Sequence, residues 1–190
     1  MSQYDAPPTD PRPLDPRPLP GEPLSLDLLN TRWNGGGTPQ DLLDSVAGLA
    51  RWLAWNGLAD RAVADRATLD ALLAAREAIA RLADVPGEPQ AVLALNEVLA
   101  HGWISRTLGP DGPQHRAEAD AADWLPAWIA ADDYLRLLAE SPDRIRSCAH
   151  PDCVLHFYDT SKNGTRRWCS MASCGNRAKA SRHYAKTKSG

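Results

Sequence analysis

The stretch that decides the fold of one end of this chain runs from Arg146 to Lys179 and reads RSCAHPDCVLHFYDTSKNGTRRWCSMASCGNRAK. It contains the four cysteines of the sequence, Cys148, Cys153, Cys169 and Cys174. They form two C-x4-C pairs with fifteen residues between them. This spacing is typical of a structural zinc site, because four thiolates complete a tetrahedron around Zn²⁺ and leave no position for water. We therefore predict one structural zinc ion per chain.

The charge of the chain is divided unevenly between this end and the rest. The formal net charge is −3, yet residues 144–190 carry ten Lys or Arg and two Asp, a net charge of +8. The remaining residues therefore carry −11. A basic segment that coincides with cysteine pairs predicts nucleic acid as its partner. The alternative is that the unlike halves attract each other and keep the protein in solution.

The first residues have a different composition. Residues 1–22 are rich in proline, and DPRPL at 10–14 recurs at 15–19. We expect a disordered leader there, because proline at nearly every second position prevents helix and sheet. No apolar run resembles a signal peptide or a membrane span, so we expect a cytoplasmic protein with no membrane partner. In that reducing compartment paired cysteines are metal ligands more often than disulfides.

Residues 23–142 read as one domain, and 143–190 as a second, smaller module. The fold class that we predict is mainly α (α+β): a helical N-terminal domain with a small β-hairpin, then a four-cysteine zinc finger with a C-terminal helix. Helices are predicted from the Thr38-Pro39 start to Asn56, over Ala62–Ala83, over Gln90–Ala100 and over Asp123–Glu140. The hairpin joins Trp103–Leu108 to Gln114–Ala119, and Leu24–Asn30 fits either a strand or a helix. Short strands over Ile145–Ser147 and Leu155–Asp159, and a last helix from Ser170 to about Tyr184, complete the prediction.

Tryptophan is unusually frequent in the first domain, which holds six of the seven in the chain. Such side chains often line ligand pockets together with a few polar groups. A pocket for a small-molecule effector would draw on Asp27, Asn30, Arg32, Trp33 and Trp103. The alternative is that the tryptophans are packed core, with Asp27 and Asn30 serving a turn and a helix cap.

Basic side chains recur through and beyond the second cysteine pair. The candidate nucleic-acid contacts are Arg166, Arg167, Asn176, Arg177, Lys179, Arg182 and Lys186. Arginine and lysine neutralise phosphates, while Asn176 and Arg177 are able to contact adenine and guanine edges. The alternatives are a solvated basic face and, for Asn176, a local capping role. Phe157, Tyr158 and Trp168 would suit base stacking on single-stranded RNA, which keeps a zinc-stabilised RNA-binding protein open as a second reading.

The string WCSMASCGNRAK at 168–179 resembles the CGNR zinc finger. Upstream, LDLLNT at 26–31, the glycine-rich turn and DLL at 41–43 are similar to the ABATE domain that usually precedes this finger. The resemblance implies a bacterial transcription regulator related to stress, whose finger binds DNA. Beside such a finger, we expect the helical N-terminal domain to sense a signal or to form a homodimer. The resemblance implies no catalytic role. Since the residues offer no nucleophile–base pair and no open metal site, we do not expect an enzyme.

Overall fold

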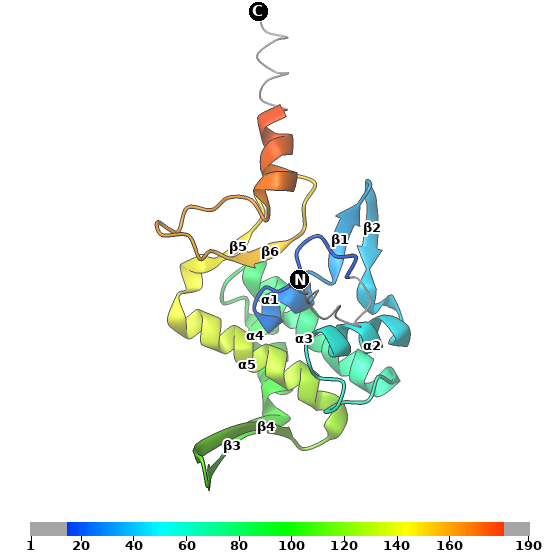
Figure 1. The fold of residues 1–190 in the computed structure, drawn as a ribbon, viewed down its shortest axis with the longest axis vertical. Helices are drawn as coiled ribbons and strands as arrows, with labels where there is room; N and C mark the ends of the chain where they lie inside the picture. The colour runs from blue at the N-terminus through cyan, green and yellow to red at the C-terminus, as the bar shows by residue number, and fades with distance from the viewer. Residues whose placement is uncertain (1–14, 181–190) are drawn as a thin grey trace, which may run out of the picture.

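The structure is a computed structural model that describes residues 15–180 of the chain. The body of the molecule is a group of packed helices (Figure 1). Its helices are α1 (Leu24–Leu29), α2 (Val46–Trp55), α3 (Arg66–Asp84), α4 (Pro89–Ala100) and α5 (Leu125–Glu140). Helix α3 packs against α4 and α5, and α1 packs against α5. Among the largest side chains of their common core are Trp52, Leu72, Ile79 and Tyr134. The predicted helical domain is confirmed.

Helices α3 and α5 begin later than the sequence predicts, α3 because a capping side chain sets its start and α5 because a 3-10 turn precedes it. Asp65 accepts a hydrogen bond from the backbone N–H of Thr68, so α3 begins at Arg66 and not at Ala62. A short 3-10 turn over Ala122–Trp124 precedes α5, which takes up most of the predicted segment Asp123–Glu140. The segment Leu24–Asn30, left open between strand and helix, forms α1.

The helix start predicted at Thr38-Pro39 is wrong. Residues Thr38–Asp41 form strand β2, which pairs antiparallel with β1 (Arg32–Gly35). Gly36 and Gly37 adopt positive φ angles, which turn the chain back so that Thr38 lies opposite Gly35. Glycine favours such a turn because it adopts positive φ without a steric penalty. The helix begins only at Val46, after Ser45 caps it by accepting from the N–H of Gly48.

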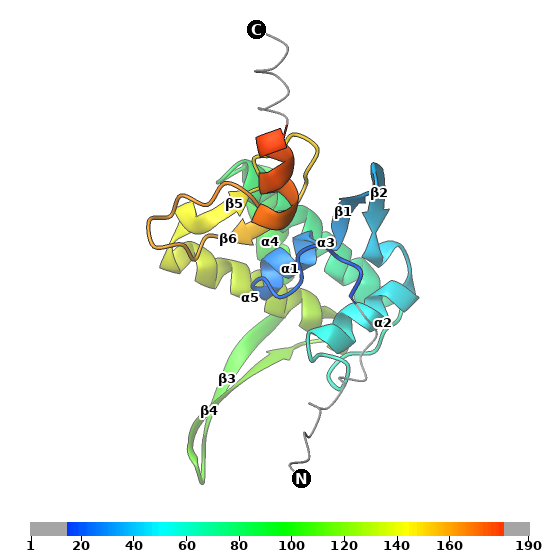
Figure 2. The same cartoon turned by 45° about the horizontal axis from the view of Figure 1, so that its top comes forward.

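The second hairpin agrees with the prediction. Strand β3 (Gly102–Gly109) pairs with β4 (Gly112–Ala119) in a register that places Trp103 opposite Glu118. Both views show this ribbon extending from the helical body (Figures 1 and 2). At the opposite end of the molecule lie β5 (Ile145–Ser147), β6 (His156–Tyr158) and the helical segment that leads to the C-terminus (Figure 2). The mainly α, α+β architecture is thus confirmed.

The helical segment near the C-terminus begins in an unusual way. Residues Met171–Gly175 form a π-type turn, and residues 176–180 continue as α-helix. The sequence predicts a regular helix from Ser170 to about Tyr184, and its later part lies outside the described residues. The predicted contacts Arg182 and Lys186, and the first copy of the DPRPL repeat at 10–14, also lie outside them.

The described part of the proline-rich leader is packed onto the body. The side chain of Arg17 is buried and donates to the Asp27 carboxylate at 2.8 Å, with Asp15 as a second partner at 2.6 Å. Trp52 Nε1 donates to the same Asp27 oxygen at 2.9 Å. A buried guanidinium needs such partners, because an isolated charge is costly to remove from water. Residues 15–22 therefore differ from the disordered segment that their proline content predicts.

Candidate metal centre

The four cysteine sulfurs lie together between β5, β6 and the π-type turn. All four Sγ atoms lie within 4.8 Å of one another. The Sγ atom of Cys169 is 3.8 Å from that of Cys153 and 3.5 Å from that of Cys174. Zn–S bonds of about 2.3 Å in a tetrahedron place neighbouring sulfurs about 3.8 Å apart. These separations fit a Zn(Cys)₄ site, and they far exceed the length of about 2.05 Å of a disulfide bond.

The protein by itself favours the thiolate form of Cys153. The hydrogen bond from Cys169 lowers the pKa of Cys153 to about 5, and donating it raises the pKa of Cys169. Burial raises the pKa of the Cys148 thiol. Several thiolates this close together repel one another, so their joint ionisation requires a cation among them. Zn²⁺ would supply that charge, and the site therefore has the chemistry of a closed structural metal centre.

Two donors outside the sulfur cluster would offset part of the negative charge of four thiolates. The backbone N–H of Cys169 donates to the Sγ of Cys148 at 3.4 Å. The guanidinium of Arg177 donates to the Sγ of Cys174 at 3.1 Å. Such contacts orient metal ligands and tune their charge. Arg177 thus supports the metal site as well as presenting its charge to solvent.

A small core holds the cysteine loops in place. Phe157 is fully buried, and the Arg166 guanidinium lies 4.1 Å from the centre of its ring. Arg166 also donates to the backbone carbonyls of Trp168 and Cys169. The carboxylate of Asp159 accepts from the backbone N–H groups of Ser161 and Arg166, each at 2.9 Å. Arg166 is therefore engaged inside the module and is poorly placed for a phosphate.

The other predicted nucleic-acid contacts within the described residues face solvent. Arg167, Asn176, Arg177 and Lys179 are all exposed. Arg167 lies 5.3 Å from the ring centre of Trp168, and the amide of Asn176 donates to the carbonyl of Ala172 at 3.3 Å. The contact of Asn176 matches the local capping role that the sequence left open.

The module is joined to the helical body by paired polar contacts. The Asn30 amide donates to the carbonyl of His156 and accepts from the N–H of the same residue, both at 2.9 Å. The carboxylate of Glu22 accepts from the Tyr158 N–H at 2.9 Å, and the Asn34 amide donates to the Asp152 carbonyl at 2.6 Å. Asn30 thus completes the hydrogen bonds of strand β6 in the way that a neighbouring strand would.

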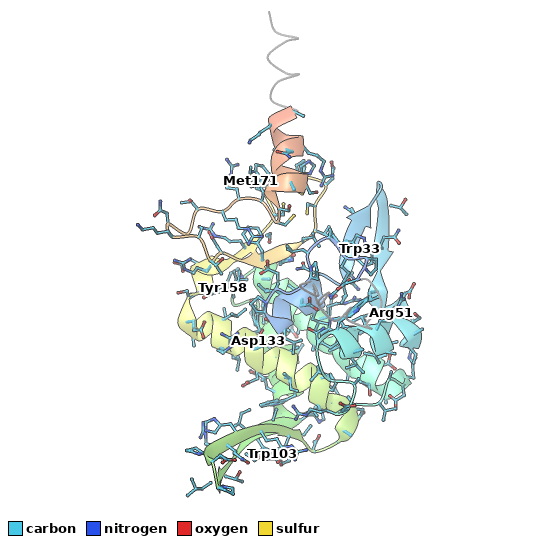
Figure 3. The ribbon with its side chains drawn as sticks, in the orientation of Figure 1. Trp33, Arg51, Trp103, Asp133, Tyr158 and Met171 are labelled. Atoms are coloured by element: carbon cyan, nitrogen blue, oxygen red, sulfur yellow. The ribbon has the colours of Figure 1, made fainter. Side chains whose placement is uncertain are left out.

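The residues predicted for a ligand pocket do not gather at one place. Arg32 and Trp33 line a cavity beside the module, whereas Asp27 and Asn30 are buried in the hydrogen bonds described above. Trp103 lies on the β3–β4 ribbon, far from Trp33 (Figure 3). The polar residues of the cavity lining that the prediction missed include Asn34, Arg76 and His156. Arg76 could have been found, since it interrupts the apolar stripe of α3 and is only 2% exposed.

These features define a zinc-finger protein with a helical N-terminal domain, and comparison with known families agrees. Residues 144–187 match the CGNR zinc finger. Residues 22–141 match the ABATE family, whose description is "Putative stress-induced transcription regulator". The chain belongs to this family. No curated protein matches it. Across residues 15–180, the structure contains no helix of the length and apolarity that crossing a membrane requires.

Proposed function

We propose that this protein is a bacterial, cytoplasmic transcription regulator that binds DNA through its zinc module, and that the helical domain senses a signal or forms a homodimer. The observation that carries the proposal is the position of the cationic residues. Arg177 and Lys179 lie on the helical segment that begins at the metal site and extends away from the body (Figure 2). Arg167 lies in the loop before it and is also exposed. Such an accessible basic surface suits a phosphate backbone.

RNA is a weaker second candidate. Of the three aromatic side chains that would stack on bases, Phe157 is fully buried and Tyr158 packs against the helical core. Trp168 is half-buried, with Arg167 beside it. A surface with one partly exposed aromatic residue and several cations favours duplex backbone contacts over a run of stacked bases. Neither the family description nor the metal chemistry of the site calls for catalysis, so the proposal includes no enzymatic activity.

The test compares two double variants that remove the same charge from opposite ends of the molecule. Arg167→Ala/Lys179→Ala removes two cations from the zinc module, and Arg106→Ala/Arg116→Ala removes two exposed cations from the β3–β4 ribbon. Affinity for a mixed-sequence DNA duplex is measured by fluorescence anisotropy from 50 to 300 mM salt. The module variant should bind more weakly, and its log–log salt slope should fall by about 1.8, because each lost phosphate contact contributes about 0.9.

The ribbon variant should keep the slope of the wild-type protein. Equal losses in the two variants would mean that net charge, and not the zinc module, governs binding. The proposal would be wrong if single-stranded RNA competed for the module more strongly than the duplex does at the same salt concentration.

A further inference from the structure

A cavity of about 560 Å³ lies where the helical body meets the zinc module. Its apolar lining includes Leu29 and Ala80 from the body, Trp33 from β1 and Val154 from the module. A volume of this size falls within the range of small-molecule sites, and such sites are mostly apolar with a few polar groups. In the side-chain view, Trp33 lies between the helices and the C-terminal module (Figure 3). The cavity therefore has walls from both parts of the chain.

The charged groups on one wall of the cavity are already paired with each other. Arg76 forms two hydrogen bonds with Asp41, at 2.7 and 2.8 Å, and is itself buried. Arg32 contacts the same carboxylate at 3.2 Å and approaches Glu77 at 3.8 Å. A charged ligand would have to compete with these pairs. The wall thus favours an uncharged ligand.

Another polar side chain of the cavity lining lacks a hydrogen-bond partner among the described residues. His156 is 9% exposed, and among the described residues neither ring nitrogen has a hydrogen-bond partner. Its Nε2 faces Asp84, another residue of the cavity lining, at 3.6 Å, which is beyond hydrogen-bond reach. Burial lowers the pKa of His156, which favours the neutral imidazole, with one donor and one acceptor, at neutral pH. A buried polar group in this state is costly, and a native protein usually has a reason to retain it.

We propose that this cavity binds a small uncharged aromatic alcohol, whose ring packs against Trp33 and Val154 and whose hydroxyl pairs with His156. A hydroxyl both donates and accepts, so it satisfies a neutral imidazole in either tautomer. Nε2 is covered by Asp84, whose side chain is two-thirds exposed, so rotation of this carboxylate toward solvent opens the way to the ring. The ion pairs that Asp41 forms with Arg76 and Arg32 remain undisturbed by such a ligand.

The site joins two parts of the molecule that are otherwise linked by a few contacts. Trp33 packs against both the helical core and the core around the cysteines. A ligand between them would stabilise the orientation of the module relative to the body. A consequence for DNA binding rests on the proposed function, but ligand binding itself does not.

The experiment uses the zinc-loaded full chain and three probes of nearly the same size: phenol, toluene and benzoate. Binding is measured by saturation-transfer NMR, without nucleic acid, so the result is independent of whether the protein binds DNA. Phenol should bind at least about fivefold more tightly than toluene, which corresponds to one net hydrogen bond, and more tightly than benzoate. Val154→Trp should fill the cavity and weaken phenol binding at least tenfold. Val63→Trp, at an exposed position outside the cavity lining, is the matched control.

His156→Leu separates a ligand contact from a structural role. This change removes the two unpartnered nitrogens and keeps an apolar group of similar size, so the melting temperature of the unliganded protein should not fall. The preference for phenol over toluene should disappear. Preserved preference in His156→Leu, equal binding by Val154→Trp and Val63→Trp, or tighter binding of benzoate would each overturn the proposal. Zinc content and far-UV circular dichroism establish that every variant is folded.

Discussion

Replacement of Asn30 by alanine should weaken the joint between the helical body and the zinc module. Asn30 is fully buried, and its amide makes both of its hydrogen bonds with the backbone of His156. In Asn30→Ala the N–H and the carbonyl of His156 lose their partner in a place that water does not reach. Each unsatisfied group costs about 1–3 kcal/mol, so the free energy of unfolding should fall by about 2–6 kcal/mol. That is a large share of the stability of a domain of this size.

The assay is urea unfolding followed by tryptophan fluorescence, with zinc release to a chromogenic chelator recorded in the same samples. Asn30→Ala should unfold at lower urea and lose zinc sooner, because the strand that Asn30 supports lies next to the cysteine loops. Asn96→Ala is the control, since Asn96 is exposed on α4 and alanine favours helix. If the two variants were equally stable to within 0.5 kcal/mol, about the spread of ordinary surface changes, the reasoning would be refuted.

Two further predictions concern the metal site and the pH dependence of stability. Cys169→Ser should lose the bound zinc and unfold the module, because metal binding is coupled to folding of such modules. Most of the helical circular dichroism should remain. The control is Ser173→Ala, at an exposed position, which should keep one zinc per chain by metal analysis. Burial acts to raise the pKa of Asp41, but its hydrogen bonds and ion pair with Arg76 outweigh burial and lower it. The pair therefore stabilises the fold above about pH 4, the range of an unfolded aspartate, and this contribution is lost as the pH falls through the lower folded pKa. The difference in unfolding free energy between wild type and Asp41→Asn should accordingly be largest near pH 7 and shrink below pH 4. A difference that stays constant with pH would contradict this prediction. The control is Asp44→Asn, at an exposed position.

The sequence contained the main features of the zinc site. Four cysteines in two C-x4-C pairs, with no others in the chain, indicated the ligands without any knowledge of the fold. Local signals were sufficient because both ligand pairs are short loops whose spacing is fixed by metal geometry. The β3–β4 hairpin was predicted for a similar reason. Its turn, Gly109-Pro110-Asp111-Gly112, is a strong local signal, and the strands beside it pair with each other in register.

The segment Thr38–Asp41 shows where local signals failed. A threonine followed by proline is a common helix start, and the apolar spacing beyond it was helical. In the fold, Thr38 pairs with Gly35, and Asp41 is held by Arg76 from α3, 35 residues further along the chain. A long-range ion pair of this kind leaves no local pattern, and it outweighs a weak local preference.

The sequence by itself determined the helical and metal-binding character of this protein, because apolar periodicity and thiolate chemistry depend on residues that are close together in the chain. Only the tertiary structure decided which polar side chains face inward. The sequence placed Arg17 in a leader, Asp27 and Asn30 in a pocket, and Arg166 among the nucleic-acid contacts. In the structure, each of these side chains makes hydrogen bonds within the fold. A buried polar group is recognised by its partners, and those of Asn30 lie 126 residues away. For the same reason the unpartnered ring of His156, and the cavity it borders, became visible only when both parts of the chain were placed together.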